Sequence, residues 1–331
     1  MSTSSRAAPT LSRRAFAAGT ALATGALASG LGGSAAWAQK SVITFGSTNA
    51  TSSHYALAVA MSKAIKQELP NANVSMIETG ASVDNVRRMT KGEIDFGLVM
   101  LDTMVQAETG SGPFKNRAVP DMAVLYAYDS VSLQMAVRVD SKVERIADLA
   151  DKKFSAGIHG SGAEVLTHQI FDVLGVKPRW VAGSVSDAVQ GIQNRQLVGY
   201  SKYGVGAGLD ATMRELLTSN PMKFVSLSGD EVKKLQGKVK GVAFEELPAG
   251  TIPGEPAATV PVVLATYSAR TGTMDDATAY AIAKAIYENR QFLIEVFPHL
   301  KNFDFKAQSL KVESLGVKLH PGARKYWMSL A

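Results

Sequence analysis

Short apolar runs alternate with helical spacings of apolar residues along the chain from residue 42 onward. The run 42–45 is typical of a buried strand, and a loop rich in Gly, Ser and Thr follows it. Leu57, Met61 and Ile65 then recur at i, i+4 and i+8, which predicts an amphipathic helix that ends before Pro70. A strand followed by a helix is typical of an α/β protein with a largely parallel sheet.

The same alternation predicts the remaining elements. Strands are expected at 74–77, 94–100, 122–128, 133–139, 153–157, 179–181, 197–201, 224–227 and 262–267. Helices are expected at 83–89, 146–150, 166–174, 187–194, 209–217 and 274–297, the last with Thr273 as a candidate cap. The alternation of strands and helices begins again after Asp140, which indicates a second lobe.

A stretch rich in Pro and Gly at 248–261 predicts a stiff, non-helical connection. We expect this stretch to return the chain to the first lobe, and two crossings between lobes imply a cleft between them. The expected division is a leader at 1–38, a first lobe at 39–137 and 251–331, and a second lobe at 138–250.

The leader has the order of a secretory signal, in which basic residues precede an uncharged stretch. The segment Ser12-Arg13-Arg14-Ala15-Phe16 resembles a twin-arginine signal, although Ala17 stands where a bulky apolar residue is usual. Ala36-Trp37-Ala38 supplies a cleavage site, so we expect cleavage before Gln39 and a protein of the periplasm. The alternative is an uncleaved membrane anchor.

Composition narrows the class of protein. The chain of 331 residues is 46% hydrophobic and 19% charged, which excludes a disordered chain and a polytopic membrane protein. It has no cysteine, so a disulfide scaffold, a thiolate metal site and a cysteine nucleophile are excluded.

The net charge of +6 includes three arginines of the leader, and the mature chain carries only +3. A cluster at Lys233, Lys234, Lys238 and Lys240 has no interleaved aromatic residues and indicates a solvated face. We therefore expect no nucleic-acid partner.

Three loops follow expected strands and precede expected helices, at 46–53, 79–82 and 160–162. Ligands of open α/β sheets bind at this edge, where helix N-termini present unpaired backbone N–H groups. Small hydroxyl residues and glycine let a carboxylate or phosphate approach closely. Each loop alone is better explained as a helix cap or a turn, but three of them from two lobes favour a small anionic ligand.

Motifs of enzymes are missing from the sequence. It contains no dinucleotide-binding, phosphate-loop or nucleophile-elbow motif, and its five histidines form no close ligand pair. His159 adjoins the Gly160 loop and either touches a ligand or packs at a strand end, and His54 begins a helix as a capping or exposed residue. We therefore expect no enzyme, no cofactor and no metal.

Several separated blocks resemble the TAXI subfamily of solute-binding proteins, which serve tripartite ATP-independent periplasmic (TRAP) transporters. The resemblance covers nearly all of 41–328, and the order and spacing of the blocks carry it. Ala81 and Ala163 depart from the Gly and Thr that the family has at these positions. The matching blocks are Gly46-Ser47-Thr48 with His54-Tyr55, Thr79-Gly80-Ala81-Ser82-Val83-Asp84-Asn85, Gly92-Glu93-Ile94-Asp95, Gly160-Ser161-Gly162, 248–254 and His320-Pro321-Gly322-Ala323.

The resemblance implies a type II periplasmic binding-protein fold, in which two α/β lobes close on a solute in a cleft at the hinge. It also implies a small carboxylate as solute, such as glutamate or a 2-oxoglutarate-like acid, and TRAP permease membrane subunits as partners. Tyr126 and Tyr128 form either an apolar wall or part of the core. The expected ligand-binding residues are Ser47, Thr48, Thr79, Gly80, Ala81, Ser82, Asn85, Asp102, Ser161, Gly162 and Lys202.

Lys202 lies in a block that departs from the family. Where the family usually has Asp-Ala followed by aromatic residues and a glycine, this chain has Val198-Gly199-Tyr200-Ser201-Lys202-Tyr203-Gly204. Lys202 either faces the cleft, where an acidic partner must offset its desolvation, or is an exposed loop lysine. The leading functional hypothesis is delivery of a small organic anion to a permease. The alternative is a sensor that presents its closed form to a membrane kinase.

Overall fold

The computed structural model describes residues 42–251 and 254–330. The expected leader at 1–38 and its cleavage before Gln39 lie outside the described residues. Among the described residues, 42–251 and 254–330, no helix is both long enough and apolar enough to cross a bilayer.

The described strands form one sheet in the order β2-β1-β3-β10-β4-β7-β5-β6, with β8 beside β4 and β9 beside β10. β1, β2 and β3 are parallel to one another, as are β5, β6 and β7, whereas β4 and β10 run antiparallel to their neighbours. The strands are β1 Val42–Gly46, β2 Asn73–Ile77, β3 Phe96–Met100, β4 Met122–Arg138, β5 Lys153–Ser155, β6 Arg179–Trp180, β7 Gly199–Tyr203, β8 Met222–Phe224, β9 Val242–Leu247 and β10 Ala258–Arg270.

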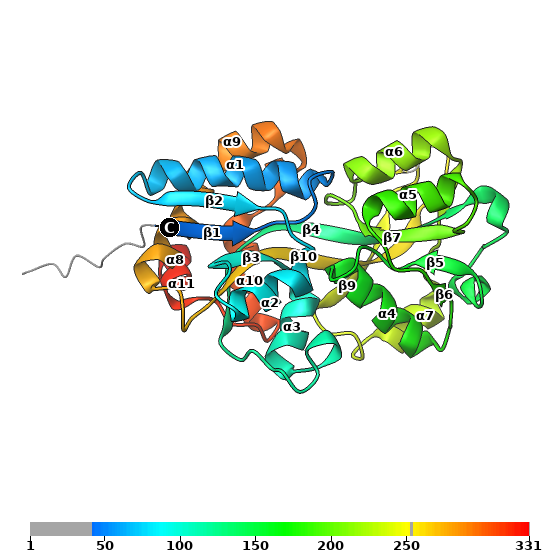
Figure 1. Cartoon of the computed structure of the whole chain (residues 1–331), viewed down its shortest axis with the longest axis horizontal. Coiled ribbons are helices and arrows are strands. Elements are labelled where there is room, and N and C mark those ends of the chain that lie inside the picture. The colour runs from blue at the N-terminus through cyan, green and yellow to red at the C-terminus, as the bar shows by residue number, and fades with distance from the viewer. Residues whose placement is uncertain (1–41, 252–253, 331) are drawn as a thin grey trace, which may run out of the picture. The chain divides into compact units, whose positions relative to one another are not determined.

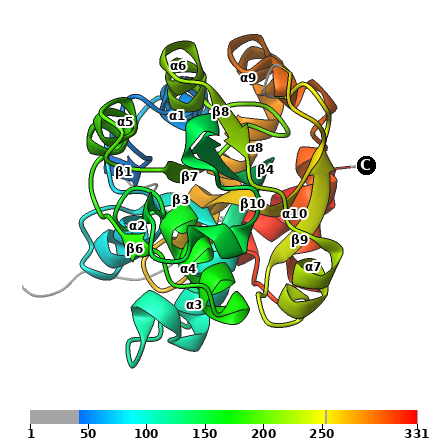
Figure 2. The same ribbon diagram turned by 90° about the vertical axis from the view of Figure 1, so that its right-hand side faces the viewer.

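Helices cover both faces of this sheet. On the side of β1 to β3, α1 and α9 lie over one face and α2 and α3 over the other; around β7, α5 and α6 lie opposite α4 and α7 (Figure 1 and Figure 2). The helices are α1 Ser53–Glu68, α2 Ser82–Thr90, α3 Leu101–Thr109, α4 Gly162–Leu174, α5 Val185–Gln193, α6 Ala211–Ser219, α7 Gly229–Leu235, α8 Asp276–Glu288, α9 Arg290–Val296, α10 Phe305–Ser314 and α11 Pro321–Ser329.

The first expected units are confirmed. β1 is an apolar strand, and α1 buries Leu57, Met61 and Ile65 on one face. Ser52 caps α1 by accepting a hydrogen bond from the backbone N–H of His54. β3 is buried along its whole length, as expected for a central strand covered on both faces.

Two long strands connect the halves of the sheet. β4 pairs with β10 as far as Ser132 and with β7 from Leu133 onward. β10 pairs with β9 as far as Val263 and with β3 from Ala265 onward. The stretch expected to return the chain, 248–261, instead connects the antiparallel strands β9 and β10, and the chain returns within β10.

The expectation of two strands at 122–128 and 133–139 is wrong, because β4 is continuous over 17 residues. The gap between the two expected strands begins at Asp129, whose carboxylate is satisfied where it lies. It accepts hydrogen bonds from the backbone N–H groups of Ser130 and Gly206. The register against β10 shifts twice on the N-terminal side of Asp129, between Asp129 and Ala127 and between Tyr126 and Val124, and the strand continues through both irregularities.

The expectation of one helix at 274–297 is also wrong. The structure divides this segment into α8 and α9 at Asn289, whose side-chain amide donates to the carbonyl of Ala285. The cap of α8 is Asp275 rather than Thr273, and its carboxylate accepts from the backbone N–H of Thr278. The expected helix at 146–150 is a 3-10 segment, and sequence patterns had not indicated α3, α7, β9, α10 or α11.

Candidate functional site

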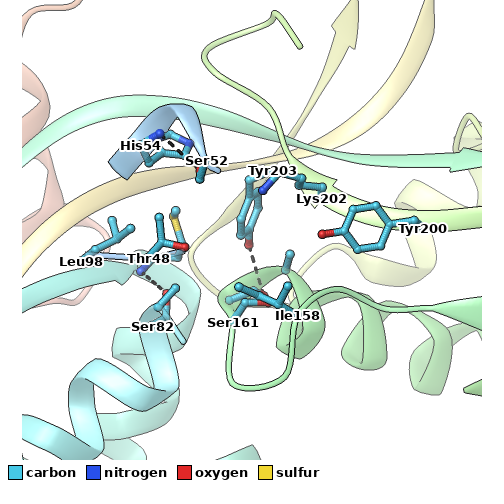
Figure 3. A pocket seen from close by; sticks show the side chains of 14 residues that line it. Thr48, Ser52, His54, Ser82, Leu98, Ile158, Ser161, Tyr200, Lys202 and Tyr203 are labelled. Carbon is cyan, nitrogen blue, oxygen red and sulfur yellow. Dashed lines mark hydrogen bonds between the residues drawn. The ribbon is translucent and has the colours of Figure 1, made fainter. Parts of the chain in front are cut away.

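A cavity of about 40 Å³ lies where the ends of the expected loops meet β7. Figure 3 shows side chains from β7 entering it from one side, with Ser52 and His54 above and Ser161 and Ile158 below. Six of the expected ligand-binding residues line this cavity: Thr48, Ala81, Ser82, Ser161, Gly162 and Lys202. The structure adds Ser52, His54, Leu98, Met100, Ile158, Ala163, Tyr200 and Tyr203.

The loop before α2 holds its shape through Thr79. The Thr79 hydroxyl donates to the carbonyl of Ser47 at 2.8 Å and accepts from the backbone N–H of Ala81 at 3.2 Å. Ala81 has φ of 69°, a conformation that favours glycine. This explains why the resembling family has glycine at this position. The alanine here adds backbone strain of about 1–3 kcal/mol beside the cavity.

The loops of the two halves contact each other directly. The backbone N–H of Val83 in α2 donates to the carbonyl of Gly160 at 2.9 Å. Ser82 accepts from the backbone N–H of Met100 at 3.1 Å, which fixes the end of β3. A Cβ atom on Gly162 would lie 2.9 Å from the Met100 side chain, so glycine is required for this close approach.

The remaining expected residues do not line the cavity. Ser47, Thr79 and Gly80 form the backbone behind it. Asn85 donates from Nδ2 to the carbonyls of Ser47 at 2.9 Å and Leu98 at 2.8 Å, and it is fully buried. It therefore joins the ends of β1 and β3 and positions the loop that carries Thr48.

Asp102 is buried in the first turn of α3, and neither of its carboxylate oxygens has a hydrogen-bond partner within the described residues. Burial raises the pKa of Asp102 to about 7, against a smaller lowering by the neighbouring Thr103. Asp102 is outside the cavity lining.

Lys202 faces the cavity and is only 9% exposed. Its ammonium lies 3.4 Å from a carboxylate oxygen of Asp210, a fully buried residue that caps α6. The expected acidic partner of Lys202 is thus supplied by the chain itself. Sequence reasoning missed Asp210, because the helix expected at 209–217 included it, whereas the observed helix begins at Ala211 and Asp210 caps it.

His54 is buried rather than exposed. Its Nε2 lies 3.1 Å from the carbonyl of Gly204, and its Nδ1 lies 3.0 Å from the hydroxyl of Tyr128. A carbonyl only accepts, so Nε2 carries the proton and Nδ1 accepts from the tyrosine, which is the arrangement of a neutral imidazole. Burial lowers the pKa of His54, in spite of the nearby carboxylates of Asp129 and Asp210.

The other aromatic and histidine candidates lie elsewhere. Tyr126 and Tyr128 are buried against Tyr267 and belong to the core rather than to the cavity wall. His159 is exposed and lies 3.1 Å from Glu164. Tyr203, which sequence reasoning did not select, enters the cavity and donates to the carbonyl of Gly162 at 3.5 Å (Figure 3).

The cavity therefore combines several hydroxyls, helix N-termini and one ammonium already paired with a carboxylate. The hydroxyls of Thr48, Ser82 and Ser161 come from the three expected loops, and each of the helices α1, α2 and α4 begins beside one of them. Such an arrangement can hold a small anion by hydrogen bonds. In the part of the chain that the structure describes, no group of three or more His, Asp or Glu side chains can hold a metal.

The fold is the α/β, two-lobe fold of periplasmic binding proteins, which confirms the expected fold class. The solved structure of the periplasmic binding protein BugD matches with a TM-score of 0.56 at 11% identity, covering 87% of this chain and 95% of that one. A protein of Bordetella bronchiseptica RB50 matches with 0.53 at 13% identity, covering 87% and 97%. XAC2383 from Xanthomonas citri, in a structure with bound ATP, matches with 0.51 at 12% identity, covering 88% and 100%. The family model that matches residues 45–328 is that of the NMT1-like family, and the chain belongs to this family.

Proposed function

We propose that this protein is a periplasmic solute-binding protein that captures a small organic carboxylate by closure of two lobes. The observation that carries the proposal is the cavity enclosed by hydroxyls from three separate loops and by Lys202 of β7. Membership of the NMT1-like family and the periplasmic-binding-protein fold support it. The protein acts by binding and release and is not an enzyme.

Closure of the lobes produces the binding energy because it assembles donors from both sides around the solute. The first lobe presents Thr48 and Ser82, and the second presents Ser161 and Lys202. Removal of water from this cavity strengthens each hydrogen bond to the carboxylate. An open form offers only half of these donors, so the solute stabilises the closed form.

The order of the blocks that resemble TAXI proteins supports a TRAP permease as the acceptor of the solute. We propose two lobes that follow the expected division, 39–137 with 251–331 and 138–250, except that the hinge lies where both long strands exchange partners. This exchange falls at 132–133 in β4 and at 263–265 in β10, so the second boundary moves from 250/251 to about 264. We further propose export by a twin-arginine-type signal at 1–38 that is cleaved before Gln39.

A thermal-shift screen of small acids tests this function. A solute at about a hundredfold excess over its dissociation constant stabilises the folded protein by about 2.7 kcal/mol, because it binds the native state alone. For a chain of about 290 residues, that raises the melting temperature by roughly 4–5 °C. The panel comprises mono- and dicarboxylates and amino acids, with uncharged sugars as controls. A screen in which no acid or amino acid raises the melting temperature contradicts the proposal.

A further inference from the structure

The charge of Lys202 is already balanced inside the protein. We propose that Asp210 acts as a resident counter-ion of Lys202, an inference that rests on the proposed function. The cavity then selects a compact solute with a single net negative charge and rejects dianions. Asp210 is thus a specificity-determining residue that need not touch the solute.

The contacts of Asp210 keep its carboxylate in place. One oxygen lies 3.4 Å from the Lys202 ammonium and accepts from the backbone N–H of Thr212 at 2.9 Å. The other accepts from the hydroxyl of Ser52 at 3.2 Å and from the backbone N–H of Ser53 at 2.9 Å. With four donors around it, the carboxylate remains ionised although it is fully buried.

Asp210 also connects the two sides of the site. Ser52 and Ser53 belong to the N-terminus of α1, whereas Asp210 caps α6. The contact is reciprocal, because the backbone N–H of Ala211 donates to the Ser53 hydroxyl at 3.0 Å. Asp210 can therefore leave Lys202 only by giving up the cap of α6 and the bonds to α1, which holds the counter-ion in place when the lobes are closed.

The other titratable groups of the lining add no charge. Burial raises the pKa of Tyr203 and of Tyr200 well above neutrality, so both hydroxyls stay protonated. Burial lowers the pKa of His54, which stays neutral. The lining of the cavity together with Asp210 thus has no net charge near pH 7.

This balance decides between singly and doubly charged solutes. A monocarboxylate brings one charge, which the hydroxyls of Thr48, Ser82 and Ser161 can meet with hydrogen bonds. A dicarboxylate brings a second charge into a buried cavity where Lys202, the cation that the described residues supply to the lining, already has a partner. Desolvation of that second charge is then not offset, and the Asp210 carboxylate repels it.

The selectivity of Asp210→Asn tests the inference. Binding is measured by calorimetry for acetate, propanoate and butanoate against malonate, succinate and 2-oxoglutarate, at one pH and ionic strength. We expect the wild-type protein to bind its best monocarboxylate more tightly than its best dicarboxylate. In Asp210→Asn, the ratio of the two affinities should shift by about tenfold or more toward the dicarboxylate, because Lys202 is then free to pair with it.

Two further variants distinguish an effect of the Asp210 charge on solute selectivity from an effect on folding. Asparagine caps helices about as well as aspartate, so Asp210→Asn should fold. Asp275→Asn makes the same change at the cap of α8, away from the cavity, and should leave the ratio unchanged. Adding Lys202→Ala to Asp210→Asn should abolish the gain in dicarboxylate binding.

Each outcome bears on one of the two proposals. A wild-type preference for dicarboxylates, or equal changes for both classes of acid in Asp210→Asn, overturns the role of Asp210 and leaves the solute-binding function standing. If the wild-type protein binds none of these acids and no acid or amino acid of the thermal-shift panel, the proposed carboxylate-binding function falls and this inference falls with it.

Discussion

Asn85→Ala is expected to lower the free energy of unfolding by about 2–4 kcal/mol. The buried Asn85 amide donates to the carbonyls of Ser47 and Leu98, and alanine leaves both without that donor. It also leaves a cavity between the ends of β1 and β3. Since Ser47 precedes Thr48 in the loop that lines the site, solute affinity should fall together with stability.

Urea unfolding of the wild-type protein and of Asn85→Ala measures this effect. Asn194→Ala is a suitable control, because Asn194 is exposed at the end of α5. The control should stay within about 0.5 kcal/mol of the wild type. If Asn85→Ala also stays within that range, Asn85 does not join the two strands as described.

Asp102→Asn is expected to stabilise the protein increasingly as the pH rises. Burial raises the pKa of Asp102 in the folded protein to about 7, so the folded state keeps a proton that the unfolded state releases. The wild type therefore loses stability as the pH rises from about 4 to about 7. Asparagine does not titrate, so the difference in unfolding free energy, variant minus wild type, should rise by about 2–4 kcal/mol between pH 4 and pH 8.

Urea unfolding of both proteins at a series of pH values tests this prediction. Titration of the histidines affects both proteins alike and cancels in the difference. A difference that stays constant or falls as the pH rises means that the Asp102 carboxyl is not buried without partners.

Periodicity was enough to predict the α/β class and most of the strands, because apolar runs and helical spacings report burial directly. It failed at Asp129, where a polar residue interrupts an apolar pattern. That carboxylate is satisfied by Gly206 and by His299, 2.8 Å away, which are far along the chain. No local pattern reports such partners, so the sequence suggested two strands where β4 is one.

The sequence predicted which loops form the candidate site better than it predicted which side chains enter the cavity. Loops at the ends of parallel strands converge by topology, and the structure brings Thr48, Ser82 and Ser161 together. Which side chain of a loop enters the cavity depends on helix orientation and packing. Asn85 therefore looked like a ligand-binding residue from its motif, but its amide points to backbone carbonyls.

The partner of Lys202 also could not be predicted from the sequence. Its place near the end of a strand suggested a cleft residue that needs an acidic partner, and the cavity lining includes it. The partner, Asp210, follows in the next loop and reaches Lys202 only because α6 begins beside α1. Sequence spacing alone gives no sign of this contact, yet the contact determines the charge of the proposed site.

Carboxylate capture by this protein is best tested by identifying the solute that the exported protein retains. The protein is purified from periplasm without added ligand, its mass is measured under native conditions, and the released small molecules are identified after denaturation. We expect one small carboxylic acid per chain, lost on denaturation and rebound by the solute-free protein. A retained molecule without an acid group, or a solute-free protein that binds no small acid, would contradict carboxylate capture.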